Sequence, residues 1–173
     1  MRRRRRRSNG VREGAAAAAL LSAAYALCAP ARAGTDTDAM AVTATVVASC
    51  DVAANDLNFL NYDPVSGAPV DASTTLEITC TNGAAYVVAL DEGTGAGATI
   101  AARRMTSGAN TLVYSLYQDA ARTTLWGETS GVDTVAGTGS GTQQTLTVYG
   151  RAPTAQTAPA GAYADTVTVT VSY

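Results

Sequence analysis

The chain has 173 residues, of which 15% are charged, and it contains neither histidine nor lysine. Without histidine, Ser-His-Asp and Cys-His nucleophile systems are excluded, as are histidine-based metal sites. The glycine-rich loop Gly93–Gly97 lacks the lysine and the following helix of a phosphate-binding loop, so it is interpreted as a surface turn. The composition therefore indicates a protein that is not an enzyme.

The N-terminus is typical of an export signal, with a basic segment, an apolar segment and a small-x-small cleavage pattern. The apolar segment is too short for a transmembrane helix. We therefore expect residues 1–33 to be a signal peptide and the exported chain to begin near Gly34. The three parts of the signal are residues 2–12, residues 15–27 and Ala31-Arg32-Ala33.

Cleavage at this site changes the charge of the protein. It removes eight of the 12 basic residues and one of the 14 acidic residues, which leaves 4 basic and 13 acidic residues and a net charge of −9. Nucleic acids and anionic membrane surfaces are bound through Lys and Arg contacts to phosphates, so this acidic chain is a poor candidate for either. The remaining length suits one domain with a sizeable core.

Two cysteines, Cys50 and Cys80, remain once Cys28 leaves with the signal. An even pair in an exported chain most simply forms one disulfide. Closing a loop of this length stabilises the fold by about 3.5 kcal/mol in the chain-entropy model. A redox pair favours Cys-x-x-Cys spacing and a zinc site needs histidine or more cysteines, so neither alternative fits.

Period-two alternation of apolar residues predicts a series of strands, and no amphipathic helix is indicated. The strands are separated by loops rich in Gly, Thr, Ser and Pro. This spacing favours an antiparallel β-sandwich and is compatible with Ig-like topology without demonstrating it. The expected strands cover residues 40–52, 76–80, 86–90, 112–116, 146–148 and 163–173.

The last expected strand alternates almost without a break up to Tyr173. Since no residues follow to form a hairpin partner, its outer backbone groups need a strand from elsewhere in the chain or from another molecule. Its core face is expected to carry Tyr163, Val167, Val169, Val171 and Tyr173, with threonine and serine on the other face.

Three groups of side chains have a binding interpretation beside a simpler one. Asp91 and Glu92 could coordinate calcium, but the loop lacks the ligand spacing of a known calcium site, which favours a solvated turn. The pair Arg103-Arg104 could clasp an anion, although such charges are more often solvated. Trp126 and the tyrosines could stack on a sugar, whereas core packing is the favoured interpretation. No cofactor or metal is expected.

Seven segments follow one another in an order that carries a family resemblance. They are Cys50-Asp-Val52, Leu57–Pro64, Ile78–Thr81, Leu112–Asp119, Leu125-Trp-Gly127, Val148–Arg151 and Gly161–Tyr173. Together they span nearly the whole exported chain, and they resemble the spore coat protein U domain family, which includes the secreted subunits of archaic chaperone-usher pili. One departure is Leu60-Asn61, where the family pattern has Phe-Gly.

The resemblance implies an all-β, Ig-like antiparallel sandwich that lacks its final strand and is completed by donor-strand complementation. A periplasmic chaperone fills the resulting groove first, and the N-terminal extension of the next pilin subunit replaces the chaperone at an outer-membrane usher. Here the pilin domain would be residues 50–173. The groove and the strand that the chaperone captures would involve Val167, Val169, Val171 and Tyr173.

By the same resemblance, residues 34–49 are the N-terminal extension and candidate donor strand. Met40, Val42, Ala44 and Val46 would enter the neighbour's groove, with Ala44 as a small plug. The alternative is that residues 40–48 continue the first strand of their own domain. The implied function is a structural subunit of a cell-surface pilus that supports adhesion and biofilm formation. A monomeric secreted coat protein or carbohydrate-binding sandwich is the alternative.

Overall fold

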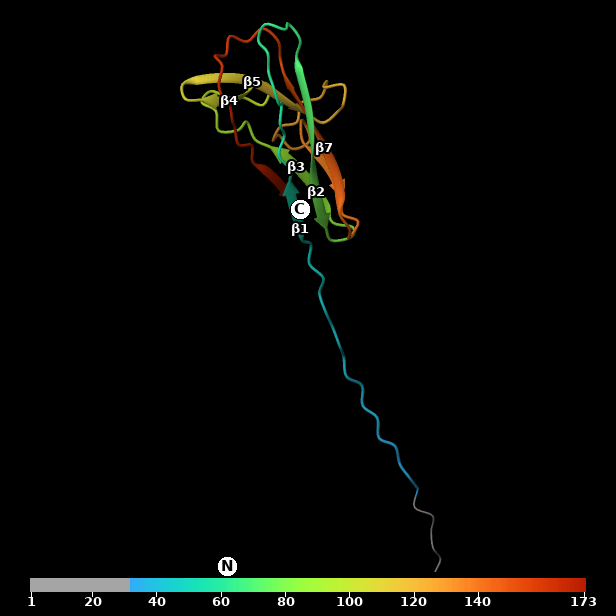
Figure 1. Cartoon of the computed structure of the whole chain (residues 1–173). Coiled ribbons are helices and arrows are strands. Elements are labelled where there is room, and N and C mark those ends of the chain that lie inside the picture. Colours follow the sequence, from blue (N-terminus) through green and yellow to red (C-terminus); the bar gives the residue numbers. More distant parts are fainter. Residues whose placement is uncertain (1–31) are drawn as a thin grey trace, which may run out of the picture. The chain divides into compact units, whose positions relative to one another are not determined.

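The computed structural model describes residues 32–173, so residues 1–31, which hold most of the expected signal peptide, lie outside the described part. The chain divides into two units between Thr43 and Ala44. In the first unit, residues 32–43 form no helix or strand and are exposed. The second unit, Ala44–Tyr173, contains every strand of the described chain (Figure 1).

The described chain is all β, and residues 32–173 form eight strands. No residue of this described part lies in a helix that could cross a membrane. The strands are β1 (Cys50–Ala54), β2 (Val70–Cys80), β3 (Ala85–Leu90), β4 (Arg103–Ser107), β5 (Asn110–Tyr117), β6 (Val135–Thr138), β7 (Gln144–Ala152) and β8 (Val169–Ser172).

The strands form two antiparallel sheets. One has five strands in the order β1-β2-β7-β5-β4, and the other has three in the order β6-β3-β8. Strands β1 and β8 are therefore edge strands of different sheets, and they contact each other. The C-terminus lies beside β1 in Figure 1. These sheets confirm the predicted all-β antiparallel sandwich.

The space between the sheets is filled by aliphatic and aromatic side chains. Trp126 is 1% exposed, and its indole Nε1 donates a hydrogen bond to the carbonyl of Val88 at 3.0 Å. Phe59 and Tyr114 meet edge to face with ring centroids 5.8 Å apart. Core packing is thus confirmed for Trp126, which is too buried to stack on a sugar. The other core members include Leu76, Ile78, Tyr86, Val88, Leu90, Leu116 and Val148.

Most alternating segments are strands, as predicted, but two strands escaped the pattern. Strand β6 lies in one of the Gly- and Thr-rich stretches between the expected strands, where the composition predicts a loop. Strand β4 begins with two arginines and shows no apolar alternation. At the other end of the chain, the strand expected over residues 163–173 shortens to β8, because residues 163–168 join no continuous ladder.

The long first strand expected over residues 40–52 is wrong. Within residues 32–173 the first strand begins at Cys50, and residues 44–49 are exposed and outside any strand. Strand β2 ends at Cys80, so a strand that began earlier would have no neighbour over most of its length. Alternation alone identifies a segment suited to a sheet but does not supply the partner strand.

The interpretation of Arg103 as a solvated charge is also wrong, because its side chain is fully buried. Its guanidinium donates to four backbone carbonyls: Asp91 at 2.7 Å, Ile100 at 3.1 Å, Leu90 at 3.0 Å and Trp126 at 2.7 Å. Arg103 thus satisfies buried carbonyls where β3 ends and does not present an anion site. Arg104 is partly exposed and donates to the carbonyl of Ala96 at 3.2 Å.

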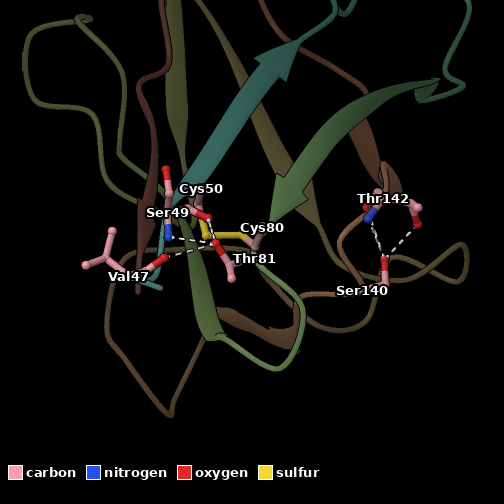
Figure 2. The surroundings of a disulfide bond; sticks show 7 residues. All are labelled: Val47, Ser49, Cys50, Cys80, Thr81, Ser140 and Thr142. Carbon is pink, nitrogen blue, oxygen red and sulfur yellow. Dashed lines mark hydrogen bonds between the residues drawn. A yellow bond between two sulfur atoms is a disulfide. The ribbon is translucent and has the colours of Figure 1, made fainter. Parts of the chain in front are cut away.

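The disulfide between Cys50 and Cys80 is present, as predicted (Figure 2). The two cysteines lie opposite each other in the β1–β2 ladder, with Cα atoms 4.1 Å apart. The bond joins the first residue of β1 to the last residue of β2. It therefore anchors an edge strand at the point where the N-terminal segment enters the sheet.

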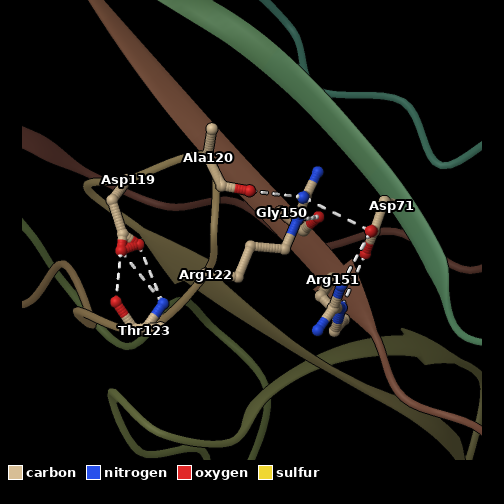
Figure 3. Close-up of polar contacts among 7 residues, drawn as sticks. All are labelled: Asp71, Asp119, Ala120, Arg122, Thr123, Gly150 and Arg151. Carbon is tan, nitrogen blue, oxygen red and sulfur yellow. Dashed lines mark hydrogen bonds and ion pairs between the residues drawn. The ribbon is translucent and has the colours of Figure 1, made fainter.

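On the outer face of the larger sheet, Asp71 connects two strands and a turn (Figure 3). Arg151 of β7 donates to both carboxylate oxygens of Asp71, at 2.7 and 2.8 Å. Nη1 of Arg122 lies 3.3 Å from Oδ2 of the same carboxylate. The hydrogen bond from Arg151 holds the pKa of Asp71 below its usual value. Since these groups are partly exposed, we assign them a small contribution to stability.

Candidate functional site

Within residues 32–173, the backbone groups on the outer edge of β8 have no hydrogen-bond partner. The amide of Asp91 donates to the carbonyl of Thr168 at 3.2 Å, and β3 and β8 continue this antiparallel register. Opposed residues of such a pair alternate between hydrogen-bonded and non-hydrogen-bonded positions. The backbone groups of Val167, Val169 and Val171 therefore point away from β3.

Strand β1 presents a matching edge. The amide of Thr81 donates to the carbonyl of Ser49 at 2.9 Å, and the amide of Asn55 donates to the carbonyl of Thr75 at 3.1 Å. By the same alternation, the backbone groups of Cys50, Val52 and Ala54 point away from β2. Within residues 32–173, no further strand pairs with either of these two edges.

A cleft of about 530 Å³ opens between the segments that lead to and from these edges. One side is formed by Ala54, Asn55 and Leu57, and the other by Tyr163, Val167 and Val169. Its floor consists of core residues of both sheets, namely Leu76, Leu90, Leu116 and Val148. We refer to this cleft and the two edges beside it as the edge groove.

The groove-side valines of the last segment are only half buried. Val167, Val169 and Val171 pack against the core but remain partly exposed, as do Val52 and Leu57 across the groove. Their shared face was predicted from the alternation. Tyr173 differs from that prediction because it follows the end of β8 and is 60% exposed.

Asp165 has the same parity as the valines and lines the groove, a position that the apolar alternation did not predict for it. Its carboxylate accepts hydrogen bonds from the hydroxyl of Tyr114 at 2.8 Å and from the amide and hydroxyl of Thr94, both at 2.8 Å. A Cβ atom at Gly93 would overlap this carboxylate, so a glycine is required there. An inward polar residue in an apolar alternation is the sequence signal that could have revealed this network.

Asp91 holds the neighbouring part of the last segment. Its Oδ1 accepts hydrogen bonds from the amides of Thr168 and Gly93, both at 2.9 Å. Burial by itself raises the pKa of this carboxyl, but the bonds from Thr168 and Gly93 outweigh it and hold the pKa below its usual value. Asp91 is thus used internally, and residues 32–173 contain no group of three acidic or cysteine side chains placed to hold a metal.

Comparison with known proteins places these features in a family. The model of the Spore Coat Protein U domain matches residues 36–170. The chain belongs to the spore coat protein U domain family.

Two relatives of this spore coat U domain are informative. Protein U of Myxococcus xanthus is 34% identical over 159 residues, which cover 83% of this chain and 88% of that protein. A chain in the crystal structure of the CsuC–CsuE chaperone-tip adhesion subunit pre-assembly complex, from archaic chaperone-usher Csu pili of Acinetobacter baumannii, is 26% identical with a TM-score of 0.55. That match covers 75% of this chain but only 41% of the other, so this chain spans about two fifths of its length.

The residues expected to act as a donor strand lie outside the sheets of the spore coat U domain. Met40 is 85% exposed, Val42 is 80% exposed and Val46 is 84% exposed, and Ala44 is exposed as well. Such a row of uncovered apolar side chains at period-two spacing is unusual on a protein surface.

Proposed function

We propose that the chain is a structural subunit of an extracellular chaperone-usher pilus and that it polymerises by donor-strand exchange. The observation that carries this proposal is the edge groove, where backbone groups of β1 and β8 that are unpaired within residues 32–173 flank half-buried valines. Where β1 and β8 contact each other they would have to move apart, and one inserted strand could then pair with both edges and cover those valines. Relatedness to a chain from a pilus chaperone-subunit complex supports the same function.

The inserted strand is the N-terminal extension of another copy. Met40, Val42 and Val46 are exposed in the described chain and would be covered in the neighbour's groove. Covering them contributes about 6 kcal/mol by apolar area, an upper figure before the cost of ordering the segment. The small side chain of Ala44 would occupy a narrower part of the neighbour's groove, between the larger side chains of Val42 and Val46. In this proposal residues 34–49 act as the donor and residues 50–173 as the acceptor domain.

Before assembly, a periplasmic chaperone occupies the groove and captures the edge that carries Val167, Val169 and Val171, with Tyr173 at its rim. An outer-membrane usher then exchanges the chaperone for the next subunit, and the product is a pilus on the cell surface that supports adhesion and biofilm formation. An exposed edge strand with an apolar face invites uncontrolled pairing, which gives such a chaperone a physical reason.

A monomeric coat protein is the alternative, and it would need no second copy to be stable. A sugar-binding version of that alternative is weakened by the burial of Trp126. An enzymatic function has no support from the spore coat U family.

A peptide of residues 36–49 tests this function on the full-length protein. When urea is removed in its presence, we expect the labelled peptide to bind in a one-to-one ratio and to raise the melting temperature, because it binds only the folded state. The matched control is the same peptide with Val42→Asp, which should not bind. Equal behaviour of both peptides, or binding of neither, would contradict the proposal.

A further inference from the structure

The extension that we propose as a donor is attached directly to one wall of its own groove. Residue 49 precedes β1, and β1 forms that wall. A tethered segment meets a site on its own molecule at an effective concentration of about millimolar, well above that of separate copies. Without a barrier, the extension would therefore fill its own groove and no fibre would form.

Filling its own groove requires the extension to reverse direction immediately before Cys50 and to run back along β1. Thr81 opposes this reversal (Figure 2). Its amide donates to the carbonyl of Ser49 at 2.9 Å, and its hydroxyl accepts from the amide of Ser49 at 3.1 Å. The same hydroxyl lies 3.4 Å from the carbonyl of Val47 and 3.3 Å from that of Ser49. These contacts continue the β1–β2 ladder past the disulfide and keep residues 47–49 in line with β1.

The sequence of the same segment is also unsuited to a turn. Residues 39–49 contain no Gly, Pro, Asn or Asp, and five of them are the β-branched Val42, Thr43, Thr45, Val46 and Val47. Tight hairpins need residues that adopt positive φ, which β-branched side chains strongly disfavour. The hydrogen bonds of Thr81 and the missing turn residues are independent obstacles to the same movement.

We propose that Thr81 is a positioning residue that holds the root of the extension, residues 47–49, in line with β1, so that the extension fills the groove of a second copy and not its own. This inference rests on the proposed function. It assigns to Thr81 the choice between an intramolecular and an intermolecular partner.

Two variants of the full-length protein weaken the two obstacles separately. Thr81→Val keeps the shape and the backbone bond to Ser49 but removes the hydroxyl. Val47→Asn with Ala48→Gly supplies a hairpin turn while Thr81 and the four donor side chains stay in place. Thr79→Val is the matched control, because Thr79 is exposed on the same strand and its hydroxyl makes no hydrogen bond within residues 32–173.

Sedimentation velocity after removal of urea measures the monomer fraction, and the labelled peptide of residues 36–49 measures whether the groove is empty. We expect Thr81→Val to raise the monomer fraction about fivefold, as the loss of one net hydrogen bond predicts. The turn variant should stay monomeric and bind the peptide at least about tenfold more weakly, and Thr79→Val should match the parent. If Thr81→Val does not fold, the turn variant tests the same barrier.

The outcomes separate this inference from the proposed function. Peptide binding by the parent together with unchanged assembly of both variants would overturn the role of Thr81 and leave the proposed function standing. Peptide binding by none of the proteins would overturn the proposed function, and the inference with it.

Discussion

The phenolic oxygen of Tyr114 lies 2.8 Å from Oδ2 of Asp165, which joins the core of the larger sheet to the segment that borders the edge groove. Burial, followed by the hydrogen bond to Asp165, raises the pKa of Tyr114 far above its usual value. Tyr114 therefore stays protonated and donates this bond throughout the neutral range. The contact fixes the position of Asp165 at the border of the edge groove.

We expect Tyr114→Phe to lower the free energy of unfolding by about 1.5–3 kcal/mol, because it removes a hydrogen bond to a charged group. Urea denaturation measures this loss. Tyr117→Phe is the control, since Tyr117 lies on the same strand and its hydroxyl makes no hydrogen bond within residues 32–173. Equal stabilities of the two variants would show that the contact contributes nothing.

Replacement of the buried Arg103 should be among the most damaging single changes in the domain. Arg103→Met leaves four backbone carbonyls without their donor, and we expect a loss of at least about 3 kcal/mol in the free energy of unfolding. Arg104→Met, in the adjacent and partly exposed position, should cost less than about 1 kcal/mol. Thermal and urea unfolding of both variants check the difference, and similar losses would contradict the internal role of Arg103.

Acid should loosen the junction between Asp91 and Thr168. The folded-state pKa of Asp91 is depressed below its ordinary value of 3.8, so its contribution to stability is present above that value and is lost as the pH falls through the folded pKa. We therefore expect the parent to lose more stability than Asp91→Asn as the pH falls below 3.8. Parallel pH profiles of unfolding for the two proteins would refute this assignment.

Much of the fold could be predicted from the sequence because it depends on local alternation. Leu76, Ile78 and Cys80 each occupy one face of a strand, and such a face is buried wherever a sheet forms. The pairing of Cys50 with Cys80 followed from the number of cysteines in an exported chain. Val167, Val169 and Val171 likewise identified the face of the last segment.

The remaining features depend on groups far apart in the chain. Arg103 is buried because carbonyls of Leu90, Asp91, Ile100 and Trp126 converge on it, and no local pattern reveals that convergence. The edge groove exists because β1 and β8, at opposite ends of the domain sequence, lie at neighbouring edges of two sheets. The first strand was predicted too long because residues 40–49 have the pattern of a strand but no partner in the described chain.

A charge in the groove wall should block its use. Val169→Asp places a carboxylate at a half-buried position of β8, so we expect lower periplasmic yield and little co-purification with a chaperone. Thr170→Asp is the control, because Thr170 is exposed on the opposite face of the same strand. Wild-type yield and co-purification for Val169→Asp would count against the incomplete fold.

The most direct test of donor-strand exchange changes the donor and leaves the groove intact. Because Val42 is 80% exposed, Val42→Asp should leave the unfolding free energy of the subunit nearly unchanged. In a neighbour's groove the same carboxylate would be buried without a partner, at a cost of several kcal/mol. Thr43→Asp, at the exposed neighbouring position of opposite parity, is the control.

Fibre mass and length after chaperone release are measured by sedimentation and electron microscopy. They distinguish a donor strand for a neighbouring subunit from a segment of the chain's own domain. We expect Val42→Asp to bind the chaperone and fold like the parent but to form no fibres, whereas Thr43→Asp should assemble. Fibres of normal length from Val42→Asp would contradict donor-strand exchange through this segment, and an unfolded Val42→Asp subunit would instead place residues 40–48 in the core of their own domain.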